Sequence, residues 1–323
     1  MATEVAQHVS ARARPPAVSV GIPILGPKVT VPGVPDWALP RLRITKLITQ
    51  GTRWRLLTVI TAPAGAGKTT ALTLWAAAGP GTVAWVGLDE LDNRPGVFWD
   101  NVVAALRRSG VALPPALPTA RQRDAGHVFL LWLAVALAAQ NPPVTLVLDD
   151  FHLLTDPELL DGLGYLLRNV GPALRLVVSA RMAPLLLHRY WLAGELTEIR
   201  ASDLAFTVAE ADLLLAQHGR TLTADCLERL TRQTGGSAAG LRLAAMSIGT
   251  HPDPGQVISE LITEDSAVPG HLLEVVLNAP PPDVRDVLLS TSLLEHISAQ
   301  AASEVATTRY GETVRRARQL ELT

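Results

Sequence analysis

The chain has almost no cysteine, because Cys226 is the only one among 323 residues. A single thiol excludes an internal disulfide and any metal site built from several cysteines, and it fits a reducing compartment. The apolar neighbours of Cys226 follow helical spacing, which favours a buried structural thiol over a reactive one. The eight histidines are scattered without the spacing of metal ligands.

The chain also lacks an excess of one charge and an apolar run of membrane length. Its 28 basic and 30 acidic residues leave a net charge of −2, which argues against a surface built to neutralise nucleic-acid phosphates. The longest apolar run, Val128–Ala139, is shorter than the about 20 residues that cross a membrane, so it predicts a buried helix. Residues 1–27 lack the order of a signal peptide. We therefore expect a cytoplasmic protein.

Hydrophobic residues are plentiful, at 48%, so the chain can bury a substantial core. Short apolar runs alternate with helical patterns through the first two-thirds of the sequence, which predicts an α/β fold with a parallel sheet. The predicted strands are Arg55–Thr61, Val83–Leu88, Val144–Asp150, Leu174–Ala180 and the shorter Leu196–Arg200. The predicted helices between them are Thr69–Ala78, Val97–Arg108, Ala125–Gln140 and Pro157–Asn169.

Helical patterns alone follow this region. Thr207 and Glu210 form a capping box that opens a helix ending at Gly219. Two more helices are predicted at Leu222–Arg232 and Ala238–Ile248, and short helices continue from about His271. We therefore divide the chain into a flexible arm (1–27), an α/β domain (28–203), a helical domain (204–255) and a further helical unit (256–323). The helical pattern is unbroken at Thr323, which predicts that this last unit is incomplete.

A glycine-rich loop, APAGAGKTT, follows the first predicted strand and opens a helix. Backbone N–H groups in such a loop converge on one point at the positive end of the helix, so they hold phosphate groups. The residues predicted to bind phosphate are Ala64, Gly65, Ala66, Gly67, Lys68, Thr69 and Thr70. Lys68 would reach the β and γ phosphates, and the Thr69 hydroxyl would bind Mg²⁺. The alternative is a Gly/Ala-rich turn before an ordinary helix.

One position departs from the usual pattern, since Ala62 stands where the first glycine of the loop is expected. That position lies at the exit of the strand, farther from the phosphates than Gly65 and Gly67. Only those two glycines need the free backbone and close approach that glycine allows. Ala62 is therefore compatible with binding.

Two carboxylates end the strand Val144–Asp150, at the edge where ligands bind in open parallel sheets. Asp149 would hold Mg²⁺, and Asp150 would orient or deprotonate the water that attacks the γ phosphate. The alternative is a strand that runs into an ordinary acidic turn.

At the end of the next strand, Arg181 is a candidate sensor of the γ phosphate, because its planar fork suits phosphate oxygens. A solvated arginine is the alternative there.

These motifs resemble those of one family, the STAND-class signal-transduction ATPases of the MalT-like, large LuxR-type transcriptional regulators. The resemblance covers residues 28–320. The residues that carry it are Ala62–Thr70, Val83–Asn93, Phe98–Trp99, Leu146–Leu154, Ser179–Arg181, Glu195–Phe206 and Ala239–Ala244. The resemblance implies a P-loop NTPase core, a small helical domain and a winged-helix-like domain, the last at residues 256–323. The family starts its loop with alanine, as Ala62 does here.

The resemblance also implies ligands and partners. ATP and ADP would bind with Mg²⁺, the ATP form would self-associate, and hydrolysis would reset the switch. Arg41 lies in a stretch that packs beside the nucleotide base in the family. Departures are Ala66, where the family has an aromatic residue, and the turn Thr234–Ser237, which lacks an acid and a tryptophan. No recognition-helix pattern is visible, so DNA binding is expected only through a C-terminal domain absent from this sequence.

The sequence leaves three functions open. The first is a nucleotide-operated switch of a LuxR-type regulator, with weak ATPase activity (ATP and water to ADP and phosphate) in which Lys68, Asp150 and Arg181 take part. The second is a stand-alone ATPase whose turnover is its function. The third is a nucleotide-binding interaction module without turnover, which the presence of both Asp149 and Asp150 disfavours.

Overall fold

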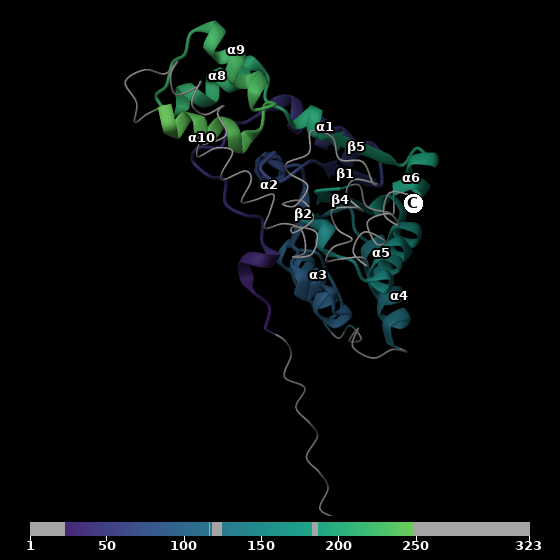
Figure 1. Cartoon of the computed structure of the whole chain (residues 1–323). Coiled ribbons are helices and arrows are strands. Elements are labelled where there is room, and N and C mark those ends of the chain that lie inside the picture. Colours follow the sequence, from purple (N-terminus) through teal and green to yellow (C-terminus); the bar gives the residue numbers. More distant parts are fainter. Residues whose placement is uncertain (1–22, 116, 118–124, 183–186, 249–323) are drawn as a thin grey trace, which may run out of the picture.

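The computed structural model describes residues 23–115, 117, 125–182 and 187–248. They form an α/β unit followed by a cluster of three helices (Figure 1). The strands are β1 (Leu57–Thr61), β2 (Thr82–Gly87), β3 (Val144–Asp149), β4 (Leu174–Ala180) and β5 (Leu196–Arg200). All five predicted strands are therefore confirmed, with ends within two residues of the prediction for β1 and one or none for the others.

The helices of the α/β unit are α1 (Leu42–Trp54), α2 (Lys68–Ala77), α3 (Pro95–Arg108), α4 (Ala125–Ala138), α5 (Pro157–Val170), α6 (Leu187–Leu192) and α7 (Ala201–Leu204). The 3₁₀ helices are η1 (Gly26–Val29), η2 (Glu90–Asn93), η3 (Phe151–Leu153) and η4 (Gly171–Ala173). The cluster that follows consists of α8 (Val208–Gln217), α9 (Ala224–Gln233) and α10 (Ala238–Ile248). The sequence patterns did not predict α1, α6 or α7.

The strands form one parallel sheet in the order β2-β3-β4-β1-β5. The strands β1 to β4 are rich in apolar residues because helices cover both faces of the sheet, whereas the edge strand β5 (LTEIR) is more polar. One face packs against α3, α4 and α5 around Phe98, Leu133 and Leu163. The opposite face packs against α1 and α2 around Ile48 and Trp75. This α/β architecture is the P-loop type of fold that the sequence predicts.

The helices α8–α10 have a small core of their own, centred on Leu215 and Leu241. In Figure 1 they lie together at one end of the molecule, beyond α1 and α2. The capping box predicted at Thr207 is present, since the Thr207 hydroxyl accepts from the Glu210 N–H and the Glu210 carboxylate accepts from the Thr207 N–H. The domain boundaries remain predictions, and the winged-helix-like unit at 256–323 lies outside the described residues.

Helix α4 corrects one expectation. Its residues Phe129, Leu133 and Leu137 are buried, as predicted for a core helix. The opposite face is half exposed, because Trp132 retains 51% and Val135 58% of their surface. The run is therefore a helix at the surface with an apolar outer face. Within the described residues, no helix is long and apolar enough to cross a membrane.

Candidate functional site

The loop between β1 and α2 has the backbone that its glycines predict. Gly65 and Gly67 have φ values of 76° and 86°, in the left-handed region that glycine tolerates best. Both also face the N-terminus of α10, since a Cβ on Gly65 would lie 2.9 Å from the Ala239 Cβ and one on Gly67 would lie 3.1 Å from the Ala238 Cβ. The two glycines are thus needed for conformation and for close packing.

Ala62, at the first position of the loop pattern, is 2% exposed and packs in the core beneath α1 and α2. The core therefore accommodates the methyl group of Ala62. Lys68, the first residue of α2, donates from its Nζ to the carbonyl oxygens of Ala62 at 2.8 Å and Pro63 at 3.0 Å. The pKa of Lys68 is lowered, chiefly by burial and further by Arg181, while the carboxylates Asp150 and Asp149 act in the opposite direction.

Asp149 ends β3 beside the loop and is only 5% exposed. The Thr69 hydroxyl donates to its Oδ2 at 2.8 Å, and the Ser179 hydroxyl donates to its Oδ1. Burial raises the pKa of Asp149, although the hydrogen bonds from Ser179 and Thr69 lower it. The structure thus brings together Thr69 and Asp149, the two predicted Mg²⁺ ligands. Ser179 belongs to the motif Ser179–Arg181, but the sequence does not predict a role for it.

Asp150 has φ 56° and ψ 40°, the only left-handed residue other than glycine in the described part of the chain. Its N–H donates to the Ser179 Oγ at 3.1 Å, so one hydroxyl orients both aspartates. Because of this turn the Asp150 side chain leaves the strand and stays 47% exposed. A carboxylate in that position can meet a water molecule while Asp149 stays buried.

His152 is a further residue at this edge whose role the sequence did not reveal. Its Nδ1 lies 3.9 Å from the Asp150 Oδ1 and has no hydrogen-bond partner within the described residues. The pKa of His152 is lowered, first by burial and then by the charges of Arg181 and Lys68, with Asp150 opposing them. This shift favours the neutral imidazole. The charge of Arg181 lowers the pKa of both Lys68 and His152, so Arg181 lies near them. This is the edge of the sheet where the sequence predicts it.

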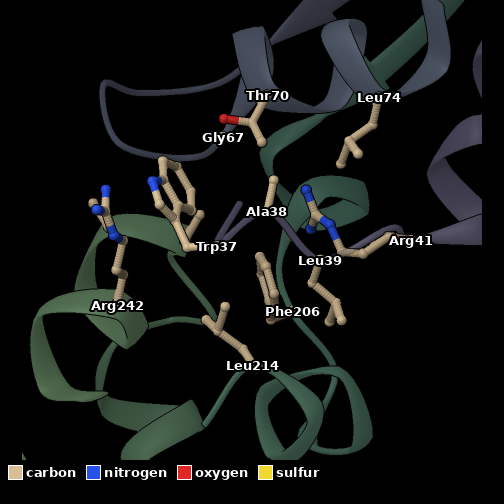
Figure 2. Close-up of a pocket in the computed structure, with 12 residues that line it drawn as sticks. Trp37, Ala38, Leu39, Arg41, Gly67, Thr70, Leu74, Phe206, Leu214 and Arg242 are labelled. Carbon is tan, nitrogen blue, oxygen red and sulfur yellow. The ribbon is translucent and has the colours of Figure 1, made fainter. Parts of the chain in front are cut away.

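A pocket adjoins the loop. Figure 2 shows side chains from the N-terminal segment, α2 and the helical cluster converging on it. Its lining is Trp37, Ala38, Leu39, Arg41, Gly67, Thr70, Leu74, Phe206, Leu214, Ala238, Ala239 and Arg242. The lining is mainly apolar, with two guanidinium groups.

Arg41 is 6% exposed in this pocket and lies over the Phe206 ring, 4.2 Å from its centroid. Its Nη1 donates to the Leu204 carbonyl oxygen. Its pKa is lowered to about 10, chiefly by burial. The charge of Glu210 raises this pKa, and the charge of Arg43 lowers it. On the opposite side, the Arg242 guanidinium lies 3.8 Å from the centroid of the Trp37 ring. Flat aromatic and guanidinium surfaces of this kind stack on planar rings.

Helix α10 contacts the loop directly. The Ala239 N–H donates to the Gly65 carbonyl oxygen at 2.9 Å, and the Ser237 hydroxyl lies 3.4 Å from the same oxygen. The turn Thr234–Ser237 lacks the acid and tryptophan of the resembling family, but it still joins the helical cluster to the phosphate loop.

The residues present fit a nucleotide with Mg²⁺. Gly65 and Gly67 leave the backbone of the loop without Cβ atoms, and an ammonium, a hydroxyl and a buried carboxylate lie beside it. Hydroxyl and carboxylate oxygens are the ligand types that Mg²⁺ takes beside phosphates. Within the described residues, no group of three or more His, Cys, Asp or Glu side chains could hold a metal alone.

The HTH-type transcriptional regulator MalT of Cronobacter sakazakii is 30% identical over 282 residues, which are 84% of this chain and 31% of MalT. The chain is a homologue of part of MalT. The serine/threonine-protein kinase PknK of Mycobacterium tuberculosis is 33% identical over 285 residues, which are 85% of this chain and 26% of PknK. This chain thus spans about a quarter to a third of the length of these relatives.

Among solved structures, the Walker-type ATPase of Pyrococcus abyssi matches this chain with a TM-score of 0.55 at 12% identity, covering 86% of this chain and 87% of that one. A likeness at this identity shows the fold alone. No protein-family model matches the sequence. The resemblance to MalT-like proteins and the P-loop fold are confirmed, whereas the roles of individual site residues remain predictions.

Proposed function

We propose that this chain binds ATP and ADP at its phosphate loop and hydrolyses ATP slowly, as the nucleotide-operated switch of a LuxR-type transcriptional regulator. The observation that carries the proposal is the contact of Thr69 and Ser179 with the buried Asp149, directly beside the glycine loop. A strand end, a helix start and a neighbouring strand end must all be in place to form it. An ordinary Gly/Ala-rich turn has no need of this arrangement.

Each side chain has a distinct role in the proposal. Lys68 exchanges the carbonyl oxygens of Ala62 and Pro63 for phosphate oxygens. Thr69 and Asp149 hold Mg²⁺, which when bound neutralises the charge of the phosphates. The exposed Asp150 accepts a proton from the attacking water.

Arg41, Phe206, Trp37 and Arg242 surround the pocket next to the loop. We propose that this pocket takes the adenine base, because its rings and guanidinium groups offer flat faces and its lining continues from Gly67 and Thr70. Since α10 lines the pocket and touches Gly65, bound nucleotide contacts both units of the molecule. Such a site is suited to switching, and the ATP form is proposed to self-associate.

The experiment that tests nucleotide binding is Lys68→Ala, with Lys46→Ala as its control. Lys68 is 7% exposed at the loop, whereas Lys46 lies exposed on α1. Loss of the Lys68 ammonium should weaken ATP and ADP binding on the order of a hundredfold, since charge-assisted phosphate contacts are strong. Lys46→Ala should leave the affinity unchanged. Titration calorimetry gives both values, and equal affinities for the two variants would contradict the proposal.

A further inference from the structure

Three successive carbonyl oxygens between the α/β unit and the helical cluster accept hydrogen bonds from arginine side chains. Arg43 donates to the carbonyl oxygens of Asp203 and Ala205, and Arg41 donates to that of Leu204. These carbonyls stand at the end of the short helix α7, where backbone oxygens have no partner within the helix. The segment leading into α8 is therefore attached to the N-terminal end of α1.

The Arg43 guanidinium also binds the helical cluster itself. Its Nε donates to the Glu210 Oε1 at 2.9 Å and its Nη2 to the Oε2 at 2.8 Å, a bidentate pair. Glu210 belongs to the capping box of α8, so its position is fixed by the helix. The pKa of Glu210 lies below its ordinary value: burial would raise it, but hydrogen bonds from Arg43 and from the Thr207 N–H lower it by more. We call this group, Arg43 with Glu210, Asp203 and Ala205, the linker clasp.

The linker clasp adjoins the pocket without lining it. Phe206 follows directly and lines the pocket, and its N–H donates to the Gly236 carbonyl oxygen at 2.9 Å. Gly236 belongs to the turn before α10, which contacts the loop at Gly65. A chain of contacts therefore runs from Arg43 through the linker to the side of the pocket that the helical cluster provides. Arg43 itself is not among the lining residues.

We infer that Arg43 is a positioning residue whose linker clasp with Glu210 seats the helical cluster against the phosphate loop and so forms the base-binding side of the nucleotide site. The inference rests on the proposed function. It assigns a distinct task to each side of the site. The amides of the loop and Lys68 belong to the α/β unit and can bind phosphate without the linker clasp, whereas the base side is complete only while α8–α10 stay seated.

The test uses two ligands with Mg²⁺, ADP and inorganic tripolyphosphate, which has phosphates but no base. Arg43→Lys keeps the charge and loses the bidentate fork, and Glu210→Gln keeps the volume and loses the charge. Glu198→Gln is the matched control, because Glu198 pairs with Arg200 at the same 2.8 Å on β5, away from the helical cluster. Titration calorimetry on the full chain gives the affinity of each variant for each ligand.

We expect both linker-clasp variants to bind ADP about tenfold more weakly, from the loss of a charge-assisted contact, and tripolyphosphate with unchanged affinity. The double variant should lose no more than the weaker-binding single variant, because both changes break one contact. Unchanged ADP affinity would overturn the inference, as would a parallel loss for tripolyphosphate, which indicates general damage to the loop. If the unaltered chain binds neither ligand, the proposed function itself fails.

Discussion

At the residue scale, Asp149 combines a costly position with a useful one. Its carboxylate is buried, receives hydrogen bonds from Thr69 and Ser179, and has Asp150 as its neighbour in sequence. Burial raises its pKa above the ordinary value of 3.8, so the ionised form is less favourable in the folded chain than in the unfolded one. A cation at this position would remove that cost. In the proposed function, this loss of stability is the consequence of keeping a carboxylate in place for Mg²⁺.

The first prediction concerns Asp149→Asn. Because the folded pKa is raised, the folded chain binds more protons than the unfolded chain above pH 3.8, and stability falls as pH rises through the raised pKa. The variant lacks this titration, so at neutral pH and without Mg²⁺ it should be more stable than the unaltered chain. The difference should shrink as pH falls. Denaturant unfolding at several pH values measures this difference in the free energy of unfolding, with the exposed Asp212→Asn as control. A variant less stable at neutral pH would contradict the account.

Arg181 carries a second prediction at this scale. Its charge acts on Lys68 and His152, which places it near the end of the phosphate loop. Arg181→Ala should lower ATP affinity about tenfold and leave ADP affinity unchanged, because its fork would contact the γ phosphate alone. The exposed Arg232→Ala on α9 is the control. An unchanged ratio of ATP to ADP affinity would remove the sensing role.

The sequence predicts some of these residues well and others not at all, for a physical reason. Lys68 and Thr69 follow the loop glycines within one turn of helix, and Asp149 ends a recognisable buried strand, so local patterns reveal them. Ser179 acts on Asp149 across two neighbouring strands, and this contact exists only after the sheet has formed. The linker clasp joins Arg43 to Glu210 across a still longer separation, and no local pattern reveals it.

At the element scale, the sequence predicts the strands but does not predict helix α1. The strands are predicted because helices on both faces require nearly continuous apolar runs. Helix α1 has several β-branched residues and begins without a side-chain cap, and Gly51 lies in its last turn. A Cβ on Gly51 would clash with the Thr58 hydroxyl of β1, so tertiary packing requires a residue that helix propensity disfavours.

The turn before α10 allows a prediction with an internal control. Gly235 and Gly236 have φ values of 57° and 66°, so alanine is strained at either position. Only Gly236 is also crowded, because a Cβ there would lie 2.8 Å from the Phe206 N and O atoms. Gly235→Ala should lower the free energy of unfolding by about 1 kcal/mol and Gly236→Ala by about 2–4 kcal/mol. Denaturant unfolding compares them, and equal losses would contradict the tight packing at Phe206.

At the scale of the whole molecule, the P-loop unit and the helical cluster meet at the loop, the pocket and the linker clasp. The Ala239 N–H on Gly65, the pocket lining and the Arg43–Glu210 pair all lie along this contact. A ligand that occupies loop and pocket together stabilises the seated arrangement by mass action. The proposal that the site acts as a switch rests on this arrangement.

Slow turnover is the expectation that distinguishes a switch from an ordinary ATPase at this scale. A switch must hold its nucleotide long enough to act, so hydrolysis should proceed well below about 1 s⁻¹, where typical enzymes turn over near 10 s⁻¹. Rapid turnover by the isolated chain would favour a stand-alone ATPase.

The most direct test of the central claim identifies the nucleotide that the chain retains. The unaltered chain and Asp150→Ala are incubated with ATP and Mg²⁺, freed of unbound ligand and denatured, and the released nucleotide is measured by mass spectrometry. Because Asp150 is the proposed proton acceptor and does not hold the phosphates, the account predicts about one nucleotide per chain in both. It should be mainly ADP in the unaltered chain and ATP in the variant. No retained nucleotide, or ADP in equal measure from both proteins, would contradict it.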